Sequence, residues 1–269
     1  MPAVSAIIEE VVDGAGYIQL PNVMSAAEAA EARTRALEIA ASPDAATLGR
    51  RHERTGQQHI RGLLAHGEIF ERMAQYREIV EIAEAMLGDD MTLGAYSARI
   101  LYPGAIEMGV HIDYPYWAMR GPFTLRPPMM VQVIWMLQDF TEQNGATLVA
   151  PRSQLLCTRP NREDFRRVAI KITGAAGDAI VSHGLLWHDT AQNHTEQPRV
   201  SLLINLLSFT PISIIFRAAA SFKNAPAITS GPKKSPFPLS STPMRGSNIV
   251  GSRICSYPSR ASPSNCGSR

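Results

Sequence analysis

Apolar and polar positions divide the chain into a helical first part and a second part made of strands. Residues 14–21 predict a turn and a short strand, because glycines precede a run of aromatic and aliphatic side chains. Ser25 and Glu28 form a capping-box pattern, which predicts a helix that runs to about residue 41. Apolar residues at helical spacing predict a second helix over residues 68–87.

A polar stretch, residues 44–66, separates the two predicted helices. It contains three of the seven histidines of the chain. Connecting segments usually run over the protein surface, so His52, His59 and His66 are expected on the surface or in loops.

From Met91 onward the helical spacing gives way to short apolar or alternating runs, separated by Gly, Pro, Asn or charged turns. Strands that follow one another without intervening helices favour a sandwich or jelly roll. We therefore expect a mainly β fold, with the two early helices packed on one outer face. The seven predicted strands span residues 91–101, 108–113, 129–137, 147–150, 168–172, 178–182 and 200–209.

Charge is distributed unevenly between two parts of the chain. Residues 1–210 carry 18 Lys or Arg and 24 Asp or Glu, whereas residues 211–269 carry eight Lys or Arg and no acidic residue. The last 59 residues also include 13 Ser and 8 Pro, a composition that rarely buries enough apolar surface to fold. We expect one domain over residues 1–210. The tail, residues 211–269, is expected to be disordered, or to replace the natural end of the domain through a reading-frame change.

The remaining composition suits an intracellular protein. No run of about 18 apolar residues predicts a membrane span, and no basic segment with an apolar core predicts a signal peptide. The three cysteines are too few and too unevenly spaced for a disulfide framework. Basic residues in the tail are too dispersed to form a nucleic-acid patch. We expect a cytoplasmic monomer or homodimer that binds a small molecule, and neither nucleic acid nor a membrane.

Candidate chemistry centres on His111-Ile112-Asp113, since side chains two residues apart in an extended segment point to the same side. A histidine and a carboxylate could then share one metal ion, with His188 as the third ligand. Two imidazoles and one carboxylate form the facial triad of non-haem Fe(II) oxygenases, which leaves coordination positions open. The sequence therefore predicts an iron site at His111, Asp113 and His188.

Arg199 follows His188 by eleven residues and is the candidate for binding a cosubstrate. A guanidinium group is permanently charged and can hold the carboxylate of a 2-oxo acid through two parallel hydrogen bonds. Ser201, two residues further on, would face the same side of the strand. His183 and His194 compete for the third ligand position, but the eleven-residue spacing to Arg199 favours His188. We expect His194 in a solvated loop.

Three motifs occur in order along the chain: His-Ile-Asp-Tyr-Pro-Tyr at residues 111–116, Trp-Met-Leu-Gln-Asp-Phe-Thr-Glu-Gln-Asn-Gly-Ala-Thr at residues 135–147, and the segment from His188 to Arg199. Together they resemble the phytanoyl-CoA dioxygenase family of Fe(II)/2-oxoglutarate enzymes. The similarity runs from about Asp13 to Phe209. It implies a double-stranded β-helix, with iron bound by the predicted triad and 2-oxoglutarate held by Arg199.

The same resemblance implies further site residues. Positions that match Trp135, Thr147, Thr190 and Ser201 lie near the cosubstrate in this family. For Trp135 the alternative is a plain core residue, the more frequent role of an aromatic side chain in a strand. The chain departs from the family at residues 151–154, where it has Pro-Arg-Ser-Gln and many relatives have Pro-Gly-Ser-His. That change affects a loop contact and leaves the predicted metal ligands unaltered.

The carboxylate of Asp113 bears on the type of reaction. Halogenating relatives carry a small residue at this position, so the retained carboxylate favours hydroxylation or a related oxidation. Tyr114, Tyr116 and Trp117 directly follow the metal motif, and are expected either to form a substrate-facing wall or to pack at the mouth of the barrel. Arg99 is a candidate contact for an anionic substrate.

The resemblance implies a dioxygenase that uses Fe(II), 2-oxoglutarate and O2. Such an enzyme oxidises, most simply hydroxylates, an unactivated C–H bond of a small molecule in secondary or lipid metabolism, while 2-oxoglutarate yields succinate and CO2. Two alternatives remain open. One is a cupin-like isomerase or dioxygenase that uses the metal without 2-oxoglutarate, and the other is a degenerate barrel that binds without catalysis.

Overall fold

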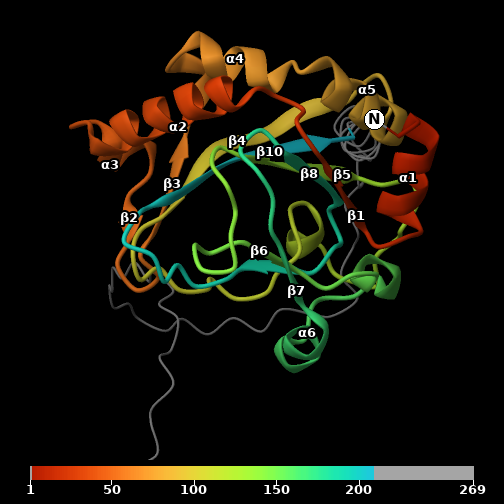
Figure 1. Ribbon diagram of the computed structural model, residues 1–269. Helices are drawn as coiled ribbons and strands as arrows, with labels where there is room; N and C mark the ends of the chain where they lie inside the picture. Colours follow the sequence, from red (N-terminus) through yellow and green to blue (C-terminus); the bar gives the residue numbers. More distant parts are fainter. Residues whose placement is uncertain (1, 209–269) are drawn as a thin grey trace, which may run out of the picture. The chain divides into compact units, whose positions relative to one another are not determined.

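The computed structural model describes residues 2–208, which form two antiparallel sheets with helices (Figure 1). The expectations for residues 211–269 fall outside the described range. Within that range, no helix has the length and apolar character needed to cross a membrane.

The larger sheet has seven strands in the order β1-β8-β5-β10-β4-β3-β2, and all neighbouring strands are antiparallel. Its central strand, β10, pairs with β4 on one side and β5 on the other. The strands span β1 Tyr17–Leu20, β2 Arg51–His52, β3 Gln57–Arg61, β4 Thr92–Leu101, β5 Met130–Met136, β8 Ala179–His183 and β10 Arg199–Leu207.

The smaller sheet faces the larger one across the interior of the barrel (Figure 1). Its order is β7-β6-β9, and a single antiparallel bridge between His111 and His188 extends it. The pair of sheets confirms the predicted mainly β, jelly-roll fold. The strands span β6 Thr147–Val149, β7 Ile170–Ile172 and β9 His188–Thr190.

Helices cover the outer face of the larger sheet, as predicted (Figure 1). Side chains such as Ile7, Ala32 and Met73 form a continuous apolar core with the outward side chains of the sheet. Helix α6 instead lies on the side of the barrel formed by the smaller sheet (Figure 1). The helices span α1 Val4–Val12, α2 Ala26–Ala41, α3 Ala45–Leu48, α4 Glu68–Ala74, α5 Arg77–Leu87 and α6 Arg162–Val168, with short 3-10 helices at Leu63–Ala65, Tyr116–Ala118 and Ser153–Leu156.

Side-chain alternation along the central strands separates the two sides of the larger sheet. On β10, Val200 and Leu202 point toward the helices, whereas Arg199 and Ser201 line an interior cavity. The same division holds on the two neighbouring strands, where Tyr96, Ala98, Val131 and Val133 face the helices and Ser97, Arg99, Gln132 and Ile134 line the cavity.

Trp135 lies on the helix-facing side, so its predicted place beside the cosubstrate is wrong. Its side chain is fully buried in the core and packs against Tyr76, with ring centroids 5.1 Å apart. It is Ile134, the preceding residue of β5, that lines the interior cavity. Strand alternation therefore gives Trp135 a packing role.

The single helix predicted over residues 68–87 is two helices, α4 and α5. The backbone of Tyr76 leaves the helical region, with φ −56° and ψ 117°, and interrupts the run. Its ring then packs against Trp135, and the hydroxyl of Tyr96 donates to the carbonyl of Phe70 at 2.7 Å. The apolar spacing continues across the break, because both helices pack on the same sheet.

The strand predicted over residues 108–113 is an irregular segment, held to the smaller sheet by the bridge at His111. Gly109 has φ 113°, a backbone conformation that side chains other than hydrogen rarely allow. Helices α1, α3 and α6 and strands β2, β3 and β9 were not predicted. The longest of them, α1, has nine residues, so each offers few positions from which a period could be recognised.

Replacing Trp135 with Ala should lower the free energy of unfolding by about 3–5 kcal/mol, because a large side chain is removed from the core. Urea denaturation measures this loss, and Trp135→Phe should retain most of the stability. The folded fraction of both variants should bind metal and cosubstrate as the unchanged protein does. Loss of cosubstrate binding at unchanged stability would contradict the packing role.

Candidate metal centre

His111, Asp113 and His188 converge inside the barrel. One potential ligand atom from each side chain lies within 4.8 Å of the others. Nε2 of His188 is 3.7 Å from Oδ2 of Asp113, and the two imidazole centroids are 4.3 Å apart. Within residues 2–208, this is the only cluster of at least three His, Cys, Asp or Glu side chains close enough to share a metal ion. The structure therefore brings the three predicted ligands together.

Backbone pairing joins the two chain segments that carry these ligands. His111 and His188 exchange two backbone hydrogen bonds, each with an N–O distance of 3.1 Å. The N–H of Asp113 donates to the carbonyl of Gly184 at 3.0 Å. Although residues 108–113 do not form a regular strand, these bonds fix the His-Ile-Asp motif against β9 and the turn that precedes it.

A backbone carbonyl orients each histidine ring. Nδ1 of His111 lies 2.9 Å from the carbonyl oxygen of Gly109, and Nδ1 of His188 lies 2.9 Å from that of Leu186. A carbonyl oxygen only accepts, so Nδ1 carries the proton in both rings. Nε2 is left unprotonated to bind a metal, an arrangement common among metal-binding histidines.

Gln132 positions the carboxylate. Its Nε2 donates to Oδ2 of Asp113 at 2.6 Å, and its side chain projects from β5 into the cavity. Gln132 is itself buried, with 4% of its surface exposed. This residue was not predicted, since its only signal in the sequence is a polar side chain within the otherwise apolar strand Met130–Met136.

Burial keeps the histidines of this cluster neutral. Burial, and after it the neighbouring His188, lower the pKa of His111 to about 4, and burial lowers the pKa of His188 to about 4. Burial also raises the pKa of Asp113 to about 6, while His111 and Arg99 oppose that increase. Neutral imidazole is the form that binds a metal, so the histidines need not lose a proton at neutral pH.

Arg199 is a buried cation near the cluster, as predicted. It is 1% exposed, and it donates to the carbonyl of Gly145 and, at 2.9 Å, to the hydroxyl of Ser201. The guanidinium carbon lies 4.4 Å from the ring centroid of Phe140. Burial, and after it the nearby cation Arg99, lower the pKa of Arg199 to about 9. No carboxylate pairs with it among residues 2–208.

A cavity of about 290 Å³ contains both the metal cluster and Arg199. Thr147 of β6, Thr190 of β9 and Ser201 of β10 line it, so the structure places these three predicted residues around one space. Arg99 of β4 also lines the cavity, and burial lowers its pKa to about 10. Two buried cations, Arg99 and Arg199, and three hydroxyl groups thus line a single cavity with the candidate metal ligands.

The three aromatic residues after the metal motif separate into two groups. Tyr114 and Trp117 line the cavity and are 47% and 56% exposed, so they fit the predicted substrate-facing wall. Tyr116 is fully buried, and its hydroxyl accepts a hydrogen bond from the N–H of Met129 at 2.9 Å. The prediction that Tyr116 faces the substrate is wrong, because Tyr116 packs in an apolar cluster with Phe123.

His59 does not lie in a surface loop, contrary to expectation. It belongs to β3 and lines the metal cavity, and burial lowers its pKa to about 3, together with Arg99 and Arg61. The competing ligand His183 is buried elsewhere, where its ring accepts the N–H of Leu185 at 3.0 Å. Strand β3 has no alternating pattern of apolar and polar residues in the sequence, and it is defined by its pairing with β4.

Gln154 occupies the position at which the sequence departs from the family pattern. Its side chain is fully buried and donates to the carbonyls of Val12 and Gly14. The preceding residue, Ser153, accepts the N–H of Trp187 at 2.8 Å. This loop therefore anchors the N-terminal segment and the chain just before His188, and does not contribute a metal ligand.

The fold and the ligand set define a class of protein: jelly-roll barrels that present two histidines and one carboxylate to a metal. Residues 12–201 match the model of the phytanoyl-CoA dioxygenase (PhyH) family. The chain belongs to this family, which confirms the resemblance seen in its motifs.

The chain is also similar to individual proteins, in sequence and in fold. The chain is 31% identical over 198 residues to the dioxygenase af480 of Aspergillus fumigatus; the match covers 70% of this chain and 62% of the relative. Among solved structures, it resembles the epimerase SnoN in complex with Fe3+, alpha ketoglutarate and nogalamycin RO, with TM-score 0.64, 19% identity, and coverage of 88% and 96%. It also resembles apo EctD from S. alaskensis, with TM-score 0.62, 22% identity, and coverage of 78% for both chains.

Replacing Gln132 with Leu should weaken Fe(II) binding about 10–100-fold, because Asp113 loses the donor that orients its carboxylate. Anaerobic titration with Fe(II) measures the affinity, and Gln132→Glu tests whether a side chain of similar length without that amide donor suffices. Unchanged Fe(II) affinity in a correctly folded Gln132→Leu protein would show that Gln132 does not position the ligand.

Proposed function

We propose that the chain is an Fe(II)- and 2-oxoglutarate-dependent oxygenase that hydroxylates an unactivated C–H bond of a small molecule. One observation carries the proposal: the His111, Asp113 and His188 cluster shares a cavity with Arg199, a buried cation that has no carboxylate partner in the described chain. Family membership supports the same assignment, as does the similar fold of the epimerase SnoN, which was solved with Fe3+ and alpha ketoglutarate.

The ligand atoms fit Fe(II). Nε2 of His111, Nε2 of His188 and a carboxylate oxygen of Asp113 would bind the ion, and the backbone carbonyls at Nδ1 hold both rings in the required tautomer. Nitrogen and oxygen donors suit this metal, and three protein ligands leave positions for other molecules. Gln132 holds the carboxylate in place from the side of β5.

Arg199 fits the distal carboxylate of 2-oxoglutarate. A buried guanidinium without an anion is costly, and a dicarboxylate would supply the missing charge. Ser201 is hydrogen-bonded to Arg199 and lies on the same face of β10, so its hydroxyl can share the carboxylate. Thr147 and Thr190 of the smaller sheet offer further hydroxyl groups from the opposite side.

Fe(II) held by these residues would couple the oxidative decarboxylation of 2-oxoglutarate by O2, which gives succinate and CO2, to insertion of the second oxygen atom into the C–H bond. The chain contributes position and exclusion of water. The apolar residue Ile134 and the two sheets enclose the reacting centre, and Tyr114 and Trp117 border the open side through which a substrate enters. Holding the target carbon at the centre converts an encounter between separate molecules into a local reaction.

The carboxylate of Asp113 favours hydroxylation. It supplies a third protein ligand, so no additional position is open for a halide. The cavity of about 290 Å³ suits a small molecule.

His111→Ala should reduce 2-oxoglutarate-dependent succinate formation to the background rate, because one of three metal ligands is lost. Arg199→Ala should raise the KM for 2-oxoglutarate at least about 100-fold, because the buried carboxylate loses its partner. Arg199→Lys is the matched variant: it keeps the charge, loses bidentate binding, and should give an intermediate KM.

Anaerobic addition of Fe(II) and 2-oxoglutarate, followed by absorption spectroscopy, gives a second readout that does not need a substrate. A metal-to-ligand band should form in the unchanged protein and be absent in His111→Ala. Product formation without 2-oxoglutarate would favour the cupin-like alternative. Absence of both the band and metal binding would favour a barrel that has lost catalysis.

A further inference from the structure

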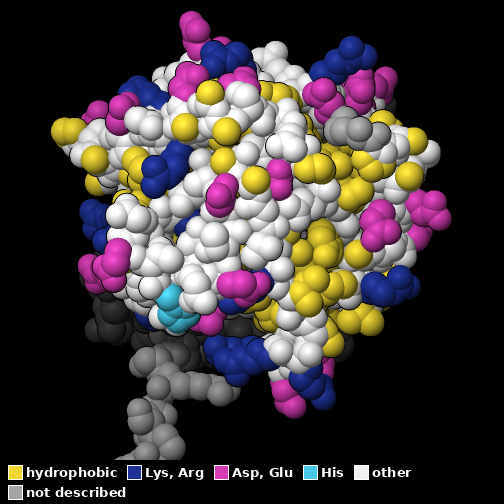
Figure 2. All heavy atoms as spheres, viewed as in Figure 1, with side chains coloured by type: hydrophobic (Ala, Val, Ile, Leu, Met, Phe, Trp, Pro, Cys, Tyr) yellow, Lys and Arg dark blue, Asp and Glu magenta, His cyan; other side chains and the backbone are white. Residues whose placement is uncertain are grey.

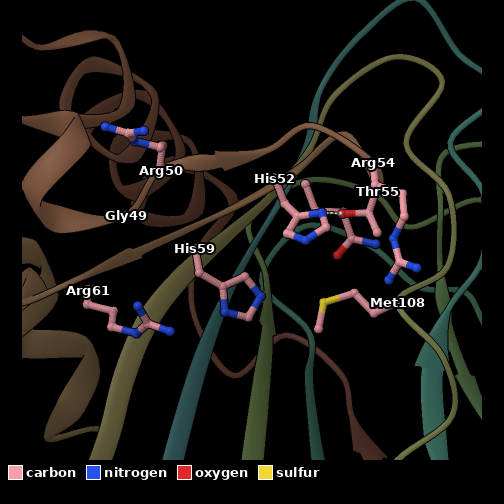
Figure 3. A pocket seen from close by; sticks show the side chains of 9 residues that line it. Gly49, Arg50, His52, Arg54, Thr55, His59, Arg61 and Met108 are labelled. Atoms are coloured by element: carbon pink, nitrogen blue, oxygen red, sulfur yellow. Dashed lines mark hydrogen bonds between the residues drawn. The ribbon is translucent and has the colours of Figure 1, made fainter. Parts of the chain in front are cut away.

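A second cavity, of about 260 Å³, adjoins the metal cavity at the edge of the larger sheet. We call it the outer cavity; it is lined by Gly49, Arg50, His52, Arg54, Thr55, Gln57, His59, Arg61 and Met108 (Figure 3). It shares His59, Arg61 and Met108 with the metal cavity. A single elongated molecule could therefore occupy both spaces.

The lining of the outer cavity is cationic. It includes three arginines, Arg50, Arg54 and Arg61, and no acidic residue. Figure 3 shows Arg50 and Arg61 on one side of His52 and His59, and Arg54 on the other. The positive charges thus flank the space and are not confined to one of its walls.

These arginines differ from most other basic residues of the domain because they lack partners. None of the three has a side-chain hydrogen bond or ion pair within residues 2–208. Elsewhere basic and acidic side chains lie side by side over the surface (Figure 2). Among the described residues, six Lys or Arg form ion pairs: Arg35 with Glu38, Arg72 with Glu31, Arg77 with Glu81, Arg126 with Asp13, Arg167 with Asp164, and Lys171 with Glu142.

Buried polar atoms between the two cavities also lack partners. Nε2 of His59 and Nε of Arg99 are buried without a hydrogen bond among the described residues. Arg99 is 5% exposed, and it lies where the metal cavity approaches His59. Buried polar groups in proteins are nearly always hydrogen-bonded to protein or to ordered water, so a molecule in this space could offer an acceptor to Nε of Arg99 and a hydrogen-bonding group to Nε2 of His59.

The wall shared by the two cavities has a fixed position. The N–H groups of Met108 and Gly109 donate to the carboxylate of Asp189, at 3.2 and 3.0 Å. Asp189 belongs to β9, next to the metal ligand His188. The segment at Met108 and Gly109 is thus held by the same strand, β9, that carries His188.

We propose that the outer cavity binds an anionic group of the substrate, a carboxylate or a phosphate, while an uncharged part of the same molecule extends to the metal cluster. This inference rests on the proposed function and adds the substrate class. The anion would contact Arg50, Arg54 and Arg61, and acceptor atoms along the molecule would meet His59 and Arg99. Substrate orientation then follows from charge, because only one end of the molecule carries it.

Calorimetric titration of the full-length, metal-free protein tests the subsite without any need for turnover. The probes are phenyl phosphate and benzoate, with benzamide as the uncharged counterpart. At least one of the two anions should bind more tightly than benzamide, and binding should weaken as salt is added. The tighter of the two anions identifies the group, phosphate or carboxylate.

The Arg50→Gln/Arg54→Gln double variant locates the bound anion. Both residues line the outer cavity, and neither lines the metal cavity, so an anion held at Arg199 would be unaffected. The dissociation constant of the tighter anion should rise about tenfold, the result expected when exposed charge contacts are lost. Both side chains are exposed and lack partners among the described residues, so thermal unfolding should be unchanged.

The matched control is Arg72→Gln/Arg77→Gln, which removes the same charge from helices α4 and α5. Anion binding should be unaffected in this control. Equal weakening in both double variants, unchanged binding in both, or equal affinity for benzamide and the anions would overturn the outer subsite. Failure of Fe(II) and 2-oxoglutarate to bind, with anion binding intact, would overturn the proposed function alone.

Discussion

Alternation of side chains along β10 is the constraint on which the site depends. This strand lies between β4 and β5, with Leu202 directed into the helix-facing core and Arg199 and Ser201 directed into the barrel. A shift of register by one residue would exchange these two sets. Burial of Val200 and Leu202 under the helices therefore holds Arg199 and Ser201 at the metal cavity. The helices thus fix the position of these polar side chains from the opposite face of the sheet.

The ligands themselves depend on a second interaction, the backbone bridge between His111 and His188. It joins an irregular segment to a three-residue strand, neither of which has much regular structure of its own. Two histidines brought together in this way would repel one another if both were charged. Burial lowers both pKa values to about 4, so at neutral pH the pair remains uncharged and available as ligands.

The ligand set and the general fold could be predicted from the sequence because they depend on local order and periodicity. His111 and Asp113 are two positions apart, and any extended backbone places them on one side, whether or not it forms a strand. Trp135 was placed beside the cosubstrate by family resemblance, whereas side-chain alternation along β5 puts it on the face opposite Gln132 and Ile134. Tyr116 was grouped with Tyr114 and Trp117 only because all three follow the metal motif; in the 3-10 helix that begins at Tyr116 it takes the packing alternative and is buried.

Among the helices too, local interactions could be predicted from the sequence and contacts between distant residues could not. The capping box at Ser25 is a local interaction and was predicted correctly, with Glu28 completing it in the structure. The break at Tyr76 was not predicted, and the ring of Tyr76 contacts Trp135, a residue distant in the sequence, across the core. His59 was assigned to the surface for a related reason: its strand is recognisable only beside β4, with which it pairs.

Cations at two depths would act differently on the anions they bind. Arg199 is buried, so its unpaired charge destabilises the protein until a carboxylate binds. The low dielectric around it would strengthen binding of the proposed cosubstrate and make that binding more dependent on geometry. Arg50, Arg54 and Arg61 are exposed, so water solvates them when no ligand is present and little is lost if they remain unpaired. The inner cation therefore favours occupancy of its site, whereas the outer cations select among molecules by orienting them. Arg199 would therefore serve the cosubstrate, which every turnover requires. The exposed arginines at the β2–β3 edge would determine which substrate binds.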